Sequence, residues 1–340
     1  KTGKYALVEM HTRFAGIALP KIQTIDIRKA HLKKQMTQQF APKMLSTITE
    51  TLEAGKQVIL FQNRRGYSPV LSCGTCAYTP NCNACDVSLT YHKWNNQLKC
   101  HYCGYTEQVP EFCPSCSAKD FSDKGFGTEQ IEESLKELLP TYVTKRMDYD
   151  TTRGKNAHQQ IITDFEQGRI DILVGTQMVT KGLDFDNVAL VGILNADSML
   201  HFPDFRAYER AFQLMMQVAG RAGRKGQQGQ VLVQTYDEEH EMFGLLKAND
   251  YTSFIRQQVQ ERKLFSYPPY NRLIGITLKH KNQRKLDETA TALVDLMRKS
   301  FGNRVLGPEY PSISRIRNYY HKNVLLKIEH EASISEAKSI

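Results

Sequence analysis

The sequence predicts an α/β fold: a parallel sheet with helices on both faces, an inserted cysteine-rich module and a C-terminal α+β domain. Short apolar runs of strand length alternate with segments of helical spacing through much of the chain. This alternation is typical of a parallel sheet covered by helices on both faces. All eight cysteines lie within residues 73–116, between the first buried strand of this pattern and the helix that follows it.

The α/β part opens with two segments of extended character. Residues 5–10 are expected to form a short strand, and an extended stretch starts at Pro20. Gly55 is the expected C-cap of the first helix, and Thr128 is the expected N-cap of the second, which Pro140 closes. The expected helices are residues 43–52, 128–139, 156–165 and 207–219. The expected strands are residues 58–61, 142–147, 170–174, 188–194 and 230–234.

A smaller domain is expected after this lobe. A helix over residues 254–263 is followed by Tyr-Pro-Pro-Tyr at 267–270, which breaks the chain. Beyond the break, the pattern predicts a strand, a helix and further strands, which indicates an α+β domain. The later elements are a helix over 286–298 and strands near 305, 313 and 324–328.

The composition is that of a globular protein with an excess of positive charge. Of the 340 residues, 24% are charged and 41% are hydrophobic, and the formal net charge is +9. No apolar run reaches the length of a membrane span, so we expect no membrane partner. Lysines and arginines gather in residues 272–327, which fits either a solvated face or a nucleic-acid surface. Since the sequence opens without Met and stops in an expected helix, we expect a piece of a longer protein.

Four Cys-x-x-Cys pairs predict two structural zinc ions. Two residues between cysteines let both thiolates turn toward one ion, and two such pairs complete a tetrahedral shell of four sulfurs. Because the sequence shows no signal peptide, a disulfide framework is the less favoured alternative, and four clustered pairs argue against a redox pair.

The spacing leaves three ways to combine these pairs. Nested pairing joins the second and third pairs across a hairpin of 14 residues (86–99), close to the usual zinc-ribbon spacer. The first and fourth pairs then share an outer ion at the neck of the module. We expect this arrangement, and adjacent or interleaved pairing are the alternatives. The predicted shells are Cys73, Cys76, Cys113 and Cys116 for one ion and Cys82, Cys85, Cys100 and Cys103 for the other.

Aromatic and cationic residues lie among the middle cysteines. Rings beside cations can stack on unpaired bases. In so small a module, most of these rings are expected to form its core instead. Trp94, the only tryptophan, is kept as a candidate DNA contact, because large aromatic residues often anchor interfaces. The other members of the set are Tyr91, His92, Lys99, His101, Tyr102 and Tyr105.

Residues 217–224 carry the sharpest catalytic signal. Arg221 and Arg224 are three positions apart, so one helical turn can aim both guanidinium groups the same way. Two such groups suit a γ-phosphate, where charge builds up during phosphoryl transfer. On spacing alone, a basic surface turn is an equally weighted alternative.

A polar segment at residues 175–184 follows an expected strand. Thr176 and Thr180 offer hydroxyls and backbone amides at the strand end, where α/β sheets usually bind ligands. Gly182 and Asp184 are placed to meet a ribose or a partner lobe. Taken alone, the segment also fits an ordinary polar loop.

Together, the last two segments resemble motifs V and VI of superfamily 2 helicases, and residues 58–65 resemble motif IV. Three further features resemble the PriA family of primosomal replication-restart helicases. They are Asn-Arg-Arg-Gly-Tyr at 63–67 leading into the cysteines, Gly-Thr-Glu at 127–129, and Asp-Tyr-Asp-Thr at 148–151. The resemblance spans essentially the whole chain, and it implies that the α/β part is a RecA-like second helicase lobe.

The resemblance also implies roles and boundaries. Arg224 would be an arginine finger, with Arg221 beside it. The residues expected on the nucleotide side are Gly182, Asp184 and Gln217, and those expected on the DNA backbone are Thr176 and Thr180. The implied domains are the end of the first lobe or a linker (1–40), the second lobe (41–62 and 125–236), the zinc insertion (63–124) and a truncated C-terminal domain (237–340).

The chain departs from a complete motor. It contains no Gly-x-x-x-x-Gly-Lys-[Ser/Thr] phosphate loop, which would cradle the β-phosphate and hold Mg²⁺. Asp-Glu-Glu-His at residues 237–240 imitates a DExH motif, but it follows the arginine motif instead of preceding it. We interpret these residues as the acidic first turn of a helix that begins near Glu238, where the helix dipole favours negative charge.

By resemblance, the full-length protein is an ATP-dependent 3′-to-5′ DNA helicase that acts at stalled replication forks and starts primosome assembly. The resemblance implies ATP, Mg²⁺ and two structural Zn²⁺ ions as cofactors. It implies forked and single-stranded DNA, single-stranded DNA-binding protein and primosome loading proteins as partners. We expect a monomer in the cytoplasm, associated with the nucleoid. This fragment alone is expected to be inactive.

Two alternatives remain open. The first is a non-enzymatic zinc-ribbon module that binds nucleic acid or protein on a degenerate helicase lobe, and an upstream phosphate loop with a true DExH motif would decide against it. The second is an RNA helicase, which shares the motor motifs. Only the resemblance of the cysteine insertion speaks against an RNA helicase.

Overall fold

The computed structural model describes residues 18–62, 70–73, 78, 80, 83, 89–92, 95–99, 105–119, 121–124, 127–154, 156–180, 185–200, 205–223, 228–311 and 313–332. The expected strand at residues 5–10 lies outside this set. The chain divides into two compact units, and the division falls within a helix. The units are Lys1–Gly66 with Gly127–Phe254, and Tyr67–Phe126 with Ile255–Ile340. The four domain boundaries expected from the sequence stay predictions.

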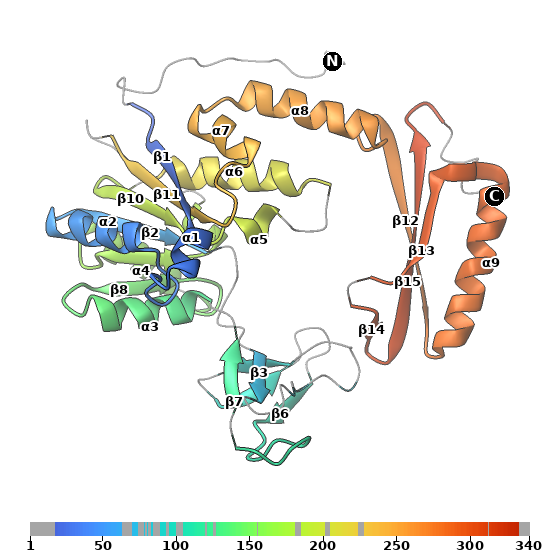
Figure 1. Cartoon of the computed structure of the whole chain (residues 1–340), viewed down its shortest axis with the longest axis horizontal. Coiled ribbons are helices and arrows are strands. Elements are labelled where there is room, and N and C mark those ends of the chain that lie inside the picture. The colour runs from blue at the N-terminus through green and yellow to red at the C-terminus, as the bar shows by residue number, and fades with distance from the viewer. Residues whose placement is uncertain are drawn as a thin grey trace. The chain divides into compact units, whose positions relative to one another are not determined.

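The first unit is built on a parallel sheet of six strands (Figure 1). In order across the sheet, the strands are β1 (Lys21–Asp26), β11 (Gln230–Thr235), β10 (Val188–Ile193), β2 (Gln57–Phe61), β9 (Ile172–Gly175) and β8 (Thr144–Met147). Every described pairing in it is parallel. β2 and β9 are buried along their whole length, which explains their apolar runs.

Helices lie between these strands in the chain or follow the last of them, and most of them pack against the sheet. They are α1 (Ile27–Leu32), α2 (Pro42–Glu53), α3 (Thr128–Leu138), α4 (Ala157–Glu166), α5 (Asp197–Leu200), α6 (Ala207–Ala219), α7 (Glu241–Lys247) and the start of α8 (Tyr251–Leu264), with a 3-10 turn η2 (Gln177–Thr180). The predicted parallel sheet with helices is therefore confirmed. Among the described helices, none combines the length and the apolar character that a bilayer crossing needs.

The stretch after Pro20 is extended, as expected, and it forms the edge strand β1 of the main sheet, which the sequence did not predict. Two local expectations were wrong. The N-cap of α3 is Gly127, because the Thr128 hydroxyl donates instead to the buried Asp148 carboxylate. Helix α7 starts at Glu241, after the acidic residues, since the His240 ring accepts the Met242 N–H and caps the helix there.

The cysteine-rich part of the second unit contains two small antiparallel sheets. Its strands are β3 (Val70–Cys73), β4 (Thr90–His92), β5 (Gln97–Lys99), β6 (Thr106–Gln108) and β7 (Phe121–Lys124). β3 pairs with β7, and β4, β5 and β6 form the other sheet. Leu71, Leu89 and Leu98 form a buried core, with Tyr91 and Tyr105 packed against it. These two rings are core, as expected for most of the set.

The C-terminal part is the expected α+β domain. Its elements are β12 (Asn271–His280), α9 (Gln283–Phe301), a 3-10 turn η3 (Gly302–Arg304), β13 (Val305–Glu309), β14 (Arg315–Ile316) and β15 (Tyr319–Glu329). β15 lies between β12 and β13, all antiparallel, and β14 also pairs with it. Val294 of α9 packs against Val324 and Leu326 of β15. The strand expected near 313 starts two residues later, at Arg315.

Candidate functional site

The described part of the predicted arginine motif, residues 217–223, begins on α6 and continues into a turn over residues 220–223 (the arginine turn) beside the first residue of β10. Gln217 is exposed on the last turn of the helix. Arg221 is half-buried, and its N–H donates to the Val218 carbonyl at 3.0 Å. The Gly223 N–H donates to the Val188 carbonyl at 3.0 Å, which fixes the turn at the amino end of β10. Gly223 has φ +77°, a left-handed conformation that favours glycine.

Residues 176–180 of the polar segment predicted from the sequence, called the threonine segment below, lie at the carboxyl end of β9. Thr176 follows the strand, and its carbonyl accepts the Val179 N–H at 3.1 Å where η2 begins. The Thr176 residue is only 2% exposed, so its side chain does not face the surface in this structure. Any contact of this loop with DNA therefore falls to the backbone and to exposed neighbours such as Gln177.

The arginine turn and the threonine segment lie at opposite ends of the parallel strands: the arginine turn at the amino edge of the sheet and the threonine segment at its carboxyl edge. Val188 pairs with Gln57 at one end of β2, whereas Phe61 at the other end pairs with Gly175. A strand rises about 3.3 Å per residue, so the two ends of β10 are about 17 Å apart along the sheet. Helix α6, which leads into the arginine turn, also packs against η2. One helix thus contacts both segments.

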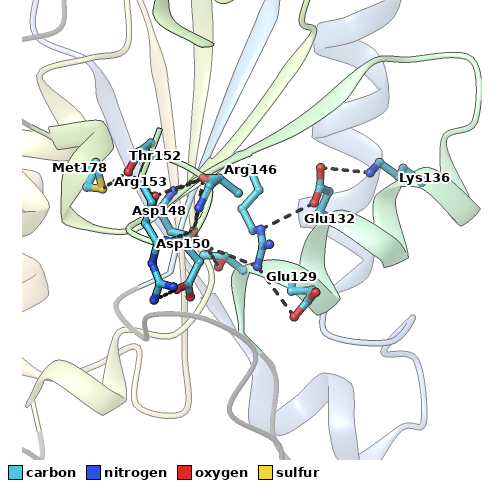
Figure 2. Close-up of polar contacts among 11 residues, drawn as sticks. Glu129, Glu132, Lys136, Arg146, Asp148, Asp150, Thr152, Arg153 and Met178 are labelled. Atoms are coloured by element: carbon cyan, nitrogen blue, oxygen red, sulfur yellow. Dashed lines mark hydrogen bonds and ion pairs between the residues drawn. The ribbon is translucent and has the colours of Figure 1, made fainter. Parts of the chain in front are cut away.

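A buried carboxylate organises the turn after β8, at the same edge as the threonine segment (Figure 2). Asp148 is 1% exposed. Its Oδ2 accepts the Thr128 hydroxyl at 2.6 Å and lies 3.5 Å from Arg146 Nη1. Its Oδ1 accepts the N–H groups of Asp150 and Thr151 at 3.0 and 3.1 Å. The turn is therefore held by β8, by α3 and by its own backbone.

The role of Asp148 was missed at the sequence level, where residues 148–151 contributed only to the resemblance. A signal was present in the spacing. The Asp148 N–H donates to Thr151 Oγ1 at 3.0 Å while the Thr151 N–H donates back to the Asp148 carboxylate. Such reciprocal bonds suit an aspartate followed three residues later by a threonine at a strand end.

Part of the predicted metal site lies among the described side chains. The N–H of Cys113, a buried residue, donates to the Ala118 carbonyl at 2.8 Å, and the Cys113 carbonyl accepts the Ser117 N–H at 2.8 Å. These bonds close a tight turn that carries both Cys113 and Cys116. A tight turn that holds two cysteines three positions apart lets both sulfurs face one ion, so this turn fits one half of a zinc shell.

The backbone at the neck of the module is compatible with nested pairing. Cys73, the last residue of β3, stands opposite Phe121 of β7, and the fourth cysteine pair shortly precedes β7 in the chain. Strand β3, which ends at Cys73 of the first cysteine pair, thus pairs with β7, which follows the fourth cysteine pair. The number of zinc ions and their pairing stay predictions. The other predicted ligand side chains fall outside the described part: Cys73, Cys76, Cys82, Cys85, Cys100 and Cys103.

Several other predicted site residues also fall outside the described part. Arg224, Gly182, Asp184 and Trp94 belong to this group, and so does the side chain of Thr180. Their roles remain predictions. The described candidates are Gln217 and Arg221 at the arginine turn and Thr176 at the opposite edge.

The C-terminal domain pairs cations with aromatic rings on its surface. Lys279 Nζ lies 5.9 Å from the centre of the Tyr319 ring, and Lys322 Nζ lies 4.6 Å from that of Tyr310. Lys322 also contacts Asp287 at 2.7 Å, and this hydrogen bond holds the pKa of the Asp287 carboxyl below its usual value. The Lys322 side chain is only 13% exposed and is neutralised by Asp287, so this pair gives no preference between a solvated face and a nucleic-acid surface for residues 272–327.

Gly175 closes β9 where the threonine segment begins, and a larger residue does not fit there. A Cβ would lie 2.2 Å from Val179 Cγ1 and 2.9 Å from the Met147 carbonyl oxygen. We expect Gly175→Ala to lower the free energy of unfolding by about 1–3 kcal/mol in urea denaturation, the usual cost of overpacking a core. Gly244→Ala on α7 is the control, because nothing lies within 4 Å of its Cβ position. Equal effects of the two substitutions would contradict this account.

Family models match three parts of the chain. Residues 82–108 match the PriA DNA helicase Cys-rich region (CRR) domain. Residues 104–226 match the helicase conserved C-terminal domain. Residues 263–340 match the primosomal protein N C-terminal domain. The order of these matches is the order of the insertion, the lobe and the C-terminal domain inferred from the sequence.

Curated proteins named replication restart protein PriA are similar to nearly the whole chain. The one from Bacillus subtilis (strain 168) is 40% identical over 335 residues, which cover 98% of this chain and 42% of that protein. The one from Synechocystis sp. is 40% identical over 94% of this chain and 39% of its own length. The one from Haemophilus influenzae is 34% identical over 99% of this chain and 46% of its own length. The chain thus spans less than half the length of these relatives.

Proposed function

Because this chain belongs to the PriA family of replication restart proteins, we propose that it forms the second motor lobe, the zinc insertion and a C-terminal domain of an ATP-dependent DNA helicase. The helicase is of superfamily 2, moves 3′ to 5′, acts at stalled replication forks and starts primosome assembly. The proposed boundaries are 41–62 with 125–236 for the second lobe and 63–124 for the insertion. Residues 1–40 were expected to be the end of the first lobe or a linker and 237–340 the C-terminal domain, but β1 and α1 from the former and α7 from the latter pack with the sheet of the second lobe.

The observation that carries this proposal is the separation of the arginine turn from the threonine segment on one sheet. A motor has to couple nucleotide turnover at one place to movement along DNA at another. Helix α6 contacts η2 and continues directly into the arginine turn. In this proposal, a shift of the turn toward a nucleotide is passed along α6 to η2, at the opposite end of the lobe.

In this proposal, the arginine turn acts on the nucleotide, and the loop of Thr176 and Thr180 acts on the DNA. Arg224 acts as the arginine finger, with Arg221 beside it, on the phosphates of an ATP held by the first lobe. The other groups on the nucleotide side are Gly182, Asp184 and Gln217. The loop of Thr176 and Thr180 tracks the DNA backbone, and Trp94 contacts DNA from the insertion.

The proposal implies defined cofactors and partners. ATP and Mg²⁺ are required for turnover, and two Zn²⁺ ions hold the insertion. The partners are forked and single-stranded DNA, single-stranded DNA-binding protein and the primosome loading proteins. The protein acts as a monomer in the cytoplasm, on the nucleoid.

ATP hydrolysis tests the proposal. The purified chain is expected to hydrolyse no ATP with or without single-stranded DNA, because it has no phosphate loop to hold the β-phosphate. The full-length protein is expected to hydrolyse ATP, and faster when single-stranded DNA is added. Robust turnover by the chain alone would contradict the assignment to a second lobe. A full-length protein that binds DNA without any ATP turnover would favour the non-enzymatic zinc-ribbon alternative.

A further inference from the structure

The turn after β8 displays an aromatic ring and a cation at the carboxyl edge of the sheet. Tyr149 is 61% exposed, and the Arg153 guanidinium carbon lies 5.2 Å from the centre of its ring. The Arg153 side chain is 65% exposed and is oriented by an ion pair with Asp150 at 2.8 Å. Single exposed rings are common on protein surfaces, so the exposure alone decides nothing. The support beneath this ring is more informative.

The ring stands on a turn that has one well-defined conformation. Asp148, directly before Tyr149, is buried and accepts hydrogen bonds from α3 and from the turn itself. The Thr152 hydroxyl closes the turn by donating to the Asp148 carbonyl at 2.6 Å. Arg146 lies 3.5 Å from the Asp148 carboxylate and 3.8 Å from both Glu129 and Glu132. A charged network of this kind below an exposed ring pre-organises that ring for a contact.

The turn also lies beside the segment proposed to track DNA. β8 and β9 are parallel neighbours, and Met147 pairs with Gly175, so the turn and the threonine segment leave the sheet at the same level. The two are in direct contact, because Thr152 Oγ1 lies 3.6 Å from the sulfur of Met178 in η2 (Figure 2). A DNA strand that follows the threonine segment would thus run past the turn that carries Tyr149.

We propose that Tyr149 and Arg153 form a stacking platform for a base of single-stranded DNA, and that Asp148 is the positioning residue that holds the platform in place. The inference rests on the proposed helicase function and names a contact through which the lobe holds the strand. A tyrosine ring stacks on any base, and a guanidinium attracts both the base and the phosphate. The platform is thus insensitive to sequence, as translocation along DNA requires.

Binding of a fluorescein-labelled oligothymidylate to the full-length protein tests the platform, with fluorescence anisotropy as the readout at fixed salt. Tyr149→Ala is expected to raise the Kd about 5- to 150-fold, the range for one stacked base. Tyr149→Phe keeps the ring and is expected to keep most of the affinity. Val143→Ala, an exposed position just before β8 at the other edge of the sheet, is the control and is expected to leave the Kd unchanged. A Kd for Tyr149→Ala within twofold of the parental value would overturn the platform.

A double variant tests the positioning role of Asp148. Asp148→Ala is expected to weaken binding in the parental protein and to add no further loss in the Tyr149→Ala background, because there is no platform left to position. Equal losses in both backgrounds would overturn this role. If Asp148→Ala does not fold, Thr128→Val takes its place, since it removes a single donor to the carboxylate.

ATP hydrolysis and oligothymidylate binding together distinguish failure of the helicase proposal from failure of the platform proposal. Without a helicase, the parental full-length protein shows no DNA-stimulated ATP hydrolysis. If only the platform is wrong, the parental protein keeps its DNA binding and its stimulated turnover. The Tyr149 variants then bind the oligothymidylate as well as the Val143→Ala control does.

Discussion

In the full-length protein, Arg224→Ala is expected to reduce DNA-stimulated ATP hydrolysis by about 10³-fold while leaving nucleotide binding largely intact. An arginine finger stabilises charge that develops on the transferred phosphoryl group in the transition state, and it contributes much less to the ground state. The loss should therefore appear in kcat. Steady-state turnover and the affinity for a fluorescent ATP analogue, measured on the same variant, separate the two effects.

Lys225→Ala is the matched control for this substitution. Lys225 carries the same charge and directly follows Arg224, but no role is assigned to it. Its replacement is expected to change turnover by no more than a few fold. A loss as large as that of Arg224→Ala would point to a general effect of positive charge in the turn. Unchanged turnover in Arg224→Ala would show that Arg224 is not a finger.

The regular elements of the lobe were predictable because their sequence signals are local. Helix α6 starts and ends where it was expected, since its apolar residues recur with helical spacing and Gly220 follows its last residue. β2 and β9 were predicted from their apolar runs, because a strand that is buried on both faces has apolar residues at successive positions. The ends of these strands differ from expectation by no more than two residues.

The elements that were missed depend on tertiary contacts. β1 mixes polar and apolar residues and pairs only with β11, as an edge strand of the sheet, so its sequence lacks the apolar run of a central strand. Thr128 has the residue type of a helix cap, but the burial of Asp148 makes the carboxylate its stronger partner. Neither partner is visible in the local sequence.

The sequence singled out candidate site residues, whose roles stay predictions, but it gave no geometry for them. The motif pattern singled out the arginine turn and the threonine segment and, by resemblance, gave them different tasks. Their placement at opposite edges depends on the hydrogen bond from Gly223 to Val188 and on the register of β10 with β2. Both features join residues that are distant in the chain, which spacing alone cannot connect.

Removal of the metal is expected to unfold the cysteine-rich module and to spare the main sheet. The buried core of the described part of this module consists of three leucines, too few to hold it without other support. Structural zinc contributes about 10–16 kcal/mol of apparent binding free energy in zinc-finger peptides, and this is folding free energy. After chelation, hydrogen exchange should accelerate in β4, β5 and β6 and stay slow in β2 and β9. Loss of protection in all of these strands together would contradict an independent module.

The nested pairing predicts which cysteines can be lost together, and zinc analysis of freshly prepared, reduced protein tests it. If the first and fourth pairs share one ion, Cys73→Ser combined with Cys113→Ser removes ligands from a single shell, and one of two zinc ions per chain remains. Adjacent and interleaved pairing both place these cysteines on different ions, so both ions are lost. Cys82→Ser combined with Cys113→Ser is the reciprocal variant: it loses both ions if the pairing is nested or adjacent and one if it is interleaved. The zinc contents of the two variants together identify the pairing. If Cys73→Ser combined with Cys113→Ser binds no zinc, nested pairing is excluded.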